Sequence, residues 1–328
     1  MAEKILIVGM INCDIPLFPV SSRLQEVEVT RVQPPKFSLG GDAANVAVSL
    51  ARLGAKPLMV GRVGSDAHGD FALAELRRFG VDTSLVRVDA QEVTSTSFHL
   101  LQEGGAHNFL FYSTTLESLC AEDVPEEALK DASIVYFGSA LTFPKMDEGG
   151  IARLFRRAHA YGAVTVMDAA LSDAKISGEA AFRQLQGAFR ETDIFFPSLV
   201  EMEYLTGQTH PHAIARCFQE TGIGLLGIKL GGRGCYVTDF QREYRFPSYS
   251  GFQAVDTVGA GDSFLGGLIY SLQKGRDLEK NISFAGAVAG FNIEHIGATA
   301  GVPQASVVES FIHRNRLRPE IRDFRSDQ

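Results

Sequence analysis

Residues 256–264, with the sequence DTVGAGDSF, place two glycines and a carboxylate at the start of an apolar segment that predicts a helix. Gly259 and Gly261 let the backbone turn its N–H groups toward a ligand, and a helix N-terminus favours an anion there. Asp262 would repel a bound phosphate, so it is better suited to act on a hydroxyl beside it. The pattern predicts a phosphoryl transferase with Asp262 as general base. The local alternative is a glycine-containing turn capped by Asp262.

A second group of polar residues lies nearer the N-terminus. Gly40 and Gly41 precede an alanine-rich helical pattern, and Asn45 lies on its first turn. The Asn45 amide can both donate to and accept from neighbouring hydroxyls of a sugar. Asp14 follows the apolar residues 5–8, which predict a buried strand, and its carboxylate could bind a ligand hydroxyl. The alternatives are a helix packed tightly on a sheet, with Asn45 as a local cap, and a surface turn at Asp14.

The composition is that of a globular protein without a nucleic-acid-binding surface. The chain has 328 residues, 45% hydrophobic and 21% charged, with a net charge of -8. An acidic protein lacks the clustered Lys and Arg that nucleic acids require, so we expect no nucleic-acid partner. The apolar run 5–8 is too short for a signal peptide or a membrane span, so we expect no membrane association. Four scattered cysteines form no CxxC pair or disulfide framework, which indicates a cytoplasmic protein.

From residue 133 onward, short apolar strands alternate with amphipathic helices. This rhythm predicts an α/β fold with a doubly wound, mostly parallel sheet flanked by helices. Neither a GxGxxG nor a GxxxxGK[ST] phosphate motif is present. Because parallel strands joined by right-handed crossovers end at one edge, ligands should bind there. The predicted strand ends are at Gly9, Gly61, Gly138, Asp168, Ser198 and Gly231.

Two segments differ from this rhythm because polar and apolar residues alternate in them. Residues 25–38 and 94–112 have the period of half-buried antiparallel strands, the second with a Gly104-Gly105 turn. We expect a small separate sheet that acts as a lid, formed by about 12–39 and 94–114. The whole of 1–316 is then one domain with further helices near 277–294 and 305–315, and 317–328 is a charged, solvated tail.

The sequence resembles the ribokinase-like (PfkB) carbohydrate kinases at four places in the expected order. Residues 40–47, GGDAANVA, and 256–264, DTVGAGDSF, look like the two signature motifs of the family. Residues 61–69, GRVGSDAHG, and 201–207, EMEYLTG, are similar to two further family blocks, so the resemblance spans about 4–312. It implies an ATP-dependent kinase that phosphorylates a hydroxyl of a sugar-like molecule, with a lid that closes over the sugar and often pairs with a second subunit in a homodimer.

The resemblance also implies roles for individual residues. Asp262 would be the general base, and the anion hole would be formed by the N–H groups of Gly259, Ala260 and Gly261. The acceptor hydroxyls would be held by Asp14, Gly40, Gly41 and Asn45. The nucleotide would lie along Ser198, Lys229, Gly231 and Gly234. Glu201 would organise Mg²⁺ through water. A monovalent cation such as K⁺ would be bound by Asp256 and the carbonyl of Val258.

Three positions depart from the family pattern. Ser198 stands where the family usually has the Asn of an Asn-x-x-Glu motif, and Gly286 stands where many members have an Asn near the adenine. Residues 112–115, YSTT, stand where many sugar kinases have a lid arginine, which argues against a phosphorylated or acidic sugar.

Two other functions are compatible with these residues. A nucleoside kinase of the same superfamily could stack a base on the aromatic side chains of the lid, namely Phe98, Phe109, Phe111 and Tyr112. A non-catalytic sugar- or nucleotide-binding regulator on the same fold is the third possibility, since fold does not determine function. Ser198 favours that possibility, whereas Asp262 and its two glycines argue against it.

Overall fold

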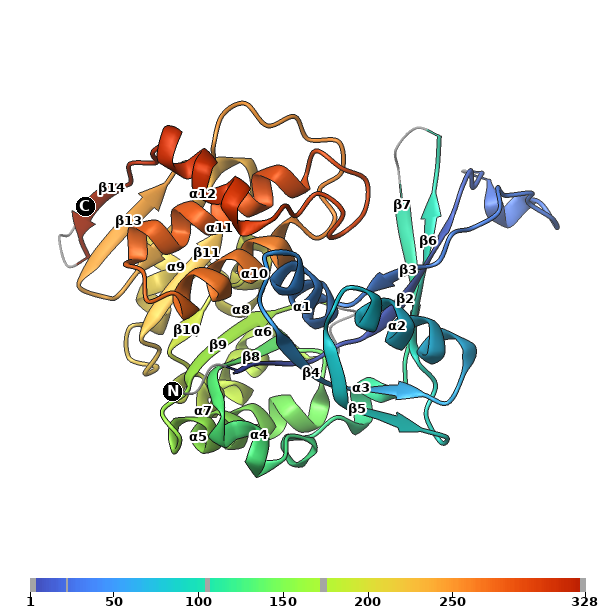
Figure 1. Cartoon of the computed structure of the whole chain (residues 1–328), viewed down its shortest axis with the longest axis horizontal. Coiled ribbons are helices and arrows are strands. Elements are labelled where there is room, and N and C mark those ends of the chain that lie inside the picture. Colours follow the sequence, from blue (N-terminus) through green and yellow to red (C-terminus); the bar gives the residue numbers. More distant parts are fainter. Residues whose placement is uncertain (1–3, 22, 104–106, 172–175, 325–328) are drawn as a thin grey trace.

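A ten-stranded sheet forms the centre of the molecule, as the computed structural model shows for residues 4–21, 23–103, 107–171 and 176–324 (Figure 1). In spatial order its strands are β14 (Glu320–Asp323), β13 (Arg242–Phe246), β12 (Cys235–Thr238), β11 (Leu225–Lys229), β10 (Ile194–Phe195), β9 (Val164–Ala169), β8 (Ala132–Ala140), β1 (Lys4–Val8), β4 (Pro57–Gly64) and β5 (Asp82–Asp89). The strands from β11 to β5 run parallel, while β12, β13 and β14 are antiparallel. The predicted doubly wound, mostly parallel sheet is confirmed.

Helices cover both faces of this sheet (Figure 1). One face packs against α4 (Glu126–Lys130), α5 (Ile151–His159), α6 (Gly178–Gln184), α7 (Gln186–Arg190), α8 (Leu199–Thr206) and α9 (Pro211–Phe218). The other packs against α1 (Asp42–Arg52), α2 (Ala67–Arg78), α10 (Ala260–Gln273) and α11 (Leu278–Asn292), with α12 (Ala305–Arg314) outside α11. The short α3 is Thr115–Ser118. Because β1 is covered on both sides, Ile5 to Val8 are fully buried, as their continuous apolar sequence predicts.

Helices α1 and α10 approach each other closely, and this contact positions the site described below. Gly266 lies against Ser49, and an added Cβ at Gly266 would lie 2.6 Å from the Ser49 Cβ. Gly267 faces Ala285 and Val288 of α11 in the same way, with an added Cβ 2.9 Å from the Ala285 Cα. The small residues of the segment after Asp262 therefore allow three helices to pack with their backbones near one another.

The second sheet projects from the body and has four strands (Figure 1). Their spatial order is β3 (Ser38–Gly40), β2 (Asn12–Leu17), β6 (Ser95–Leu101) and β7 (His107–Tyr112). β2 and β6 are parallel, whereas the other two pairs are antiparallel. Two of the lid strands that the sequence predicts are thus confirmed, and the Gly104-Gly105 turn lies outside the described residues.

The predicted strand over 25–38 is wrong. A 3-10 turn covers Leu24–Glu26, residues 27–37 have no strand pairing, and only Ser38–Gly40 joins the sheet. Val29 is 81% exposed, because no second layer covers the alternate apolar residues of this segment. An alternating pattern requires such a layer to stabilise a strand.

The charged tail expected at 317–328 is exposed over Glu320–Asp323, but these residues also form a strand that the sequence did not indicate. β14 pairs antiparallel with β13, and Phe324 is buried beside Phe240 and His212. Two predicted helices differ in detail. The helix expected at 147–161 begins only at Ile151, after a turn in which Gly149 has φ +105°, and the one expected at 178–190 divides into α6 and α7.

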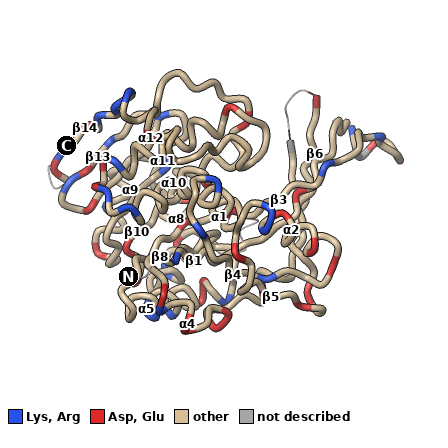
Figure 2. The backbone as a smooth tube through the Cα atoms, viewed as in Figure 1, with Lys and Arg blue, Asp and Glu red and all other residues tan. Residues whose placement is uncertain are grey.

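Two further observations concern the distribution of charged and apolar residues along the chain. Figure 2 shows Lys and Arg interspersed with Asp and Glu along the chain. Among the described residues, no helix is both long and apolar enough to cross a membrane.

Candidate active site

The loop before α10 is fixed by its own backbone and one carboxylate. Asp256 accepts hydrogen bonds from the N–H groups of Val258, at 3.0 Å, and Gly297, at 2.9 Å. Gly259 is the N-cap residue of α10 with φ +71°, a conformation that disfavours side chains, and an added Cβ would overlap the backbone of Ala298. Only a glycine therefore fits at this position. It allows α10 to begin here, and the N–H groups of the first turn of α10 are left without helical partners.

Asp262 lies in that first turn and contacts the first turn of α1. The Asn45 side chain, only 7% exposed, donates a hydrogen bond to Asp262 Oδ2 at 2.8 Å. Burial and the neighbouring carboxylate of Asp42 raise the pKa of Asp262 to about 7, and Glu201 adds to this shift. The Asn45 hydrogen bond and the charge of Lys229 oppose it. A carboxyl with this pKa can both hold and release a proton near neutral pH.

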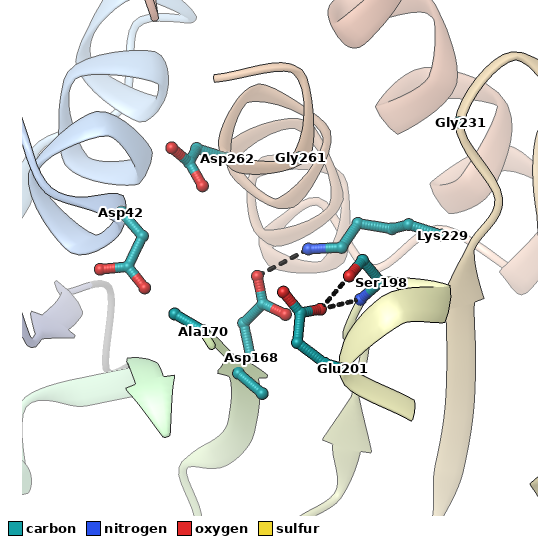
Figure 3. Close-up of a pocket in the computed structure, with 10 residues that line it drawn as sticks. Asp42, Asp168, Ala170, Ser198, Glu201, Lys229, Gly231, Gly261 and Asp262 are labelled. Atoms are coloured by element: carbon teal, nitrogen blue, oxygen red, sulfur yellow. Dashed lines mark hydrogen bonds and ion pairs between the residues drawn. The ribbon is translucent and has the colours of Figure 1, made fainter. Parts of the chain in front are cut away.

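Asp262 borders a cavity of about 340 Å³ at the carboxyl edge of the main sheet (Figure 3). Its lining residues are Asp42, Asp168, Ala169, Ala170, Ser198, Glu201, Lys229, Gly231, Gly261 and Asp262. They come from the ends of β9 and β11 and from the starts of α1, α8 and α10. The convergence of strand ends that the sequence predicts therefore occurs around Asp168, Ser198 and Gly231.

Lys229 and Asp168 form an ion pair inside the cavity. Lys229 Nζ lies 2.7 Å from Asp168 Oδ2, whereas Asp168 Oδ1 is buried and has no hydrogen-bond partner. Burial raises the pKa of Asp168 although Lys229 opposes the shift. Burial lowers the pKa of Lys229, but Asp168 and Glu201 raise it by more, so the ammonium stays charged.

Sequence reasoning assigned no site role to Asp168 or Asp42. Asp42 Oδ1 accepts from the Ala43 N–H at 2.7 Å, while its Oδ2 is buried without a partner. Burial raises the pKa of Asp42. Their positions in the sequence could have indicated a site role. Asp168 directly follows an apolar strand pattern, and Asp42 lies inside the motif at residues 40–47.

Ser198 and Glu201 form a capping box at the start of α8. The backbone N–H and the hydroxyl of Ser198 both donate to Glu201 Oε2 (Figure 3). The Ser198 hydroxyl is thus engaged with Glu201, and both residues line the cavity. Among the described residues, no three or more His, Cys, Asp and Glu side chains are arranged to ligate a metal ion directly.

The other predicted nucleotide and cation residues lie in different surroundings. Gly231 lines the cavity, but Gly234 does not and instead packs against the backbone of Phe246 and Pro247. Val258 is 47% exposed beside Asp256.

The predicted acceptor residues Asp14, Gly40 and Gly41 lie together where the small sheet joins the body. Asp14 is inside β2, and an added Cβ at Gly40 would overlap its carboxylate. Gly41 is the N-cap residue of α1 with φ +88°, and an added Cβ there would lie 2.6 Å from the Met10 carbonyl oxygen. His99 of β6 also faces Asp14, with Nε2 3.3 Å from Oδ1, and sequence reasoning missed it.

Comparisons with known proteins agree with this geometry. Residues 2–305 match the profile of the pfkB family carbohydrate kinases. Fructokinase-1 of Zea mays is 32% identical over 302 residues, covering 87% of this chain and 92% of that protein. Fructokinase-1 of Oryza sativa subsp. japonica is 33% identical over 291 residues, covering 84% and 89%.

Solved structures show the same fold. The fructokinase with bound ATP from Xylella fastidiosa superimposes with a TM-score of 0.82 at 25% identity, covering 96% of this chain and 99% of that chain. An Arabidopsis thaliana ribokinase complexed with ribose and ATP gives 0.81 at 23% identity, covering 95% and 99%. The fold is ribokinase-like, a class of α/β protein with a sheet lid beside the main sheet. Since the family profile and the two plant relatives extend over most of its length, the chain belongs to the pfkB family of carbohydrate kinases.

Proposed function

We propose that this carbohydrate kinase transfers the γ-phosphoryl group of ATP to a hydroxyl of a sugar, with Asp262 as general base. The observation that carries the proposal is the position of Asp262, which lies on the first turn of α10 and is held by Asn45 at 2.8 Å. A carboxylate beside the N–H groups of a helix N-terminus can accept a hydroxyl proton while those groups stabilise the transferred phosphoryl. The Ala260 N–H donates to the Thr257 carbonyl at 3.2 Å here and would have to turn to the phosphoryl group. The similarity to an ATP-bound fructokinase supports ATP as donor.

We assign a separate role in phosphoryl transfer to each of the following residues. Asp262 would remove the proton from the acceptor hydroxyl, and the N–H groups of residues 259–261 would form the anion hole. Lys229, charged and directed into the cavity, would neutralise the phosphates of the donor. Ser198, Gly231 and Gly234 remain our proposed nucleotide contacts, although the Ser198 hydroxyl would first have to leave Glu201.

The charge of the cavity suits a hydrated divalent cation. Asp168 and Asp42 each keep one buried carboxylate oxygen without a partner, and Glu201 lines the same space. Mg²⁺ retains several waters in such sites, so these carboxylates would hold it through water rather than directly. When bound with ATP, the ion would offset negative charge on the phosphates. We further propose Asp256 and the Val258 carbonyl as ligands of a monovalent cation.

The test is the isosteric variant Asp262→Asn. ADP release coupled to sugar phosphorylation should fall by about 10²–10⁴-fold, the usual contribution of a positioned general base. Asp70→Asn, an exposed carboxylate on α2, is the matched control and should keep the wild-type rate. A panel of fructose, ribose, 2-keto-3-deoxygluconate, adenosine and inosine identifies the acceptor. Near wild-type turnover by Asp262→Asn on its best acceptor would show that another group is the base.

A further inference from the structure

One face of the small sheet collects side chains that can bind a polyhydroxylated molecule. Side chains alternate between the two faces of a strand, and the register pairs Asp14 with Ser97 and His99 with Phe109. Asn12, Asp14, Ser97, His99 and Phe109 therefore share one face. This inference rests on the function proposed above, because it concerns the acceptor of the same reaction.

Near the junction with the body, the opposite face of the sheet packs against α2. Thr96 points to that face, where its hydroxyl lies 2.9 Å from Nδ1 of His68 on α2. The Thr96 hydroxyl also donates to the Thr94 carbonyl at 3.0 Å, so His68 Nδ1 must be the donor in their contact. His68 is thus a structural histidine behind the sheet, whereas His99 is on the face with Asp14.

His99 is held in a defined orientation by two neighbours. Its Nε2 lies 3.3 Å from Asp14 Oδ1, and its ring meets the ring of Phe109 edge-on, with centroids 4.7 Å apart. Asn12 Nδ2 donates to the same Asp14 oxygen. The side chains of His99 and Asp14 are 18% and 14% exposed, so both are largely enclosed yet reachable by a ligand.

The charges on this face decide which acceptors it can bind. None of the strands β2, β3, β6 and β7 contains a lysine or an arginine. A phosphate or carboxylate on the acceptor would meet the Asp14 carboxylate without a lysine or arginine from these strands to pair with it. An uncharged sugar offers hydroxyls to Asp14 and His99 and an apolar C–H face to the Phe109 ring.

We propose that His99 is a specificity-determining residue of the acceptor site, and that with Asp14 it hydrogen-bonds hydroxyls of an uncharged sugar. The imidazole adds a donor or acceptor that the carboxylate alone lacks, and it holds the carboxylate in place.

The experiment compares His99→Leu, His99→Gln and His68→Gln by steady-state kinetics on the best neutral sugar. His99→Leu should raise the KM of the sugar about tenfold or more, because the variant loses one hydrogen bond between the sugar and the His99–Asp14 pair. Its KM for ATP should not change. His99→Gln should recover most of the loss, because the glutamine amide can take the place of imidazole Nε2. His68→Gln is the matched control on the opposite face and should keep the wild-type KM of the sugar.

Two results would overturn the inference while leaving a sugar kinase intact. One is an unchanged sugar KM in His99→Leu, and the other is a preference for a phosphorylated or acidic sugar over its neutral counterpart. If the wild-type protein phosphorylates no sugar, the proposed function fails instead. Calorimetric titration of wild type and His99→Leu with fructose and ribose then decides the inference alone, since weaker binding to the variant supports it and equal or absent binding refutes it.

Discussion

At the scale of single residues, the ionisation of Asp262 would control when this proposed base can act. Its pKa of about 7 means that the carboxylate is partly protonated at neutral pH in the free protein. A general base works in its deprotonated form, so kcat/KM for the sugar should rise with pH through about 7 and level off above it.

The neighbour Asp42 provides a check on this assignment. Asp42→Asn keeps the size of the side chain and the oxygen that accepts from Ala43, but it removes a negative charge that raises the pKa of Asp262. The rising limb of the pH profile should therefore move to lower pH in this variant. A limb that stays in place would mean that a group other than Asp262 produces it.

How much of the site the sequence predicts depends on the kind of residue. Asp262, Asn45, Gly40 and Gly41 lie in contiguous motifs whose spacing already indicates a helix N-terminus. The structure places Gly41, Asn45 and Asp262 at such termini, and Gly40 ends β3 directly before one of them. His99 could not be found in this way, because the role proposed for it depends on strand register. The pairing of β2 with β6 brings it to Asp14, and no local pattern encodes that pairing.

At the scale of elements, the contact between α1 and α10 positions Asp262, the proposed base. Gly266→Ala would place a methyl group 2.6 Å from the Ser49 Cβ and force the two helices apart. We expect a loss of about 1–3 kcal/mol in the free energy of unfolding, typical of overpacking. Because Asn45 and Asp262 lie on these helices, turnover should fall as well.

Chemical denaturation and kinetics on a double-mutant cycle with Ser49→Gly test this expectation. The double variant removes the atom that the new methyl meets, so it should be less destabilised than the sum of the two single variants. Additive losses would show that the helices do not collide at this point.

Elements with strong local signals are those that the sequence predicts well. The apolar strands of the main sheet are buried on both faces, and their continuous apolar sequence indicates this directly. The failures at 25–38 and at β14 have the opposite cause. The first has a strand pattern but no layer to cover it, and the second has a charged sequence, EIRD, that is ordered by pairing with β13 and by the burial of Phe324.

At the scale of the whole molecule, the projecting sheet has an unsatisfied edge. In the described part of the chain β7 pairs only with β6, and Leu110 and Tyr112 are 58% and 54% exposed. Exposed apolar edge strands readily pair with another chain. We therefore predict a homodimer through the lid.

Sedimentation velocity across a concentration series tests this prediction. Leu110→Lys should shift the protein toward monomer, since it places a charge in the proposed interface. The control is Val164→Lys, at a similarly partly exposed apolar position of β9 away from the lid, which should leave the association state unchanged. A wild-type protein that sediments as a monomer at all concentrations would contradict the prediction.

The hydrogen bond between Asn45 and Asp262 joins residues 217 positions apart in the chain. Such a contact closes a very long loop, and contacts of this separation make folding slow. No fragment that ends before α10 can contain both partners, so under the proposed mechanism catalytic competence would arise late as the chain is synthesised. Recovered turnover after dilution from denaturant should follow the last refolding phase, and the activity of this enzyme is therefore a reporter of complete folding.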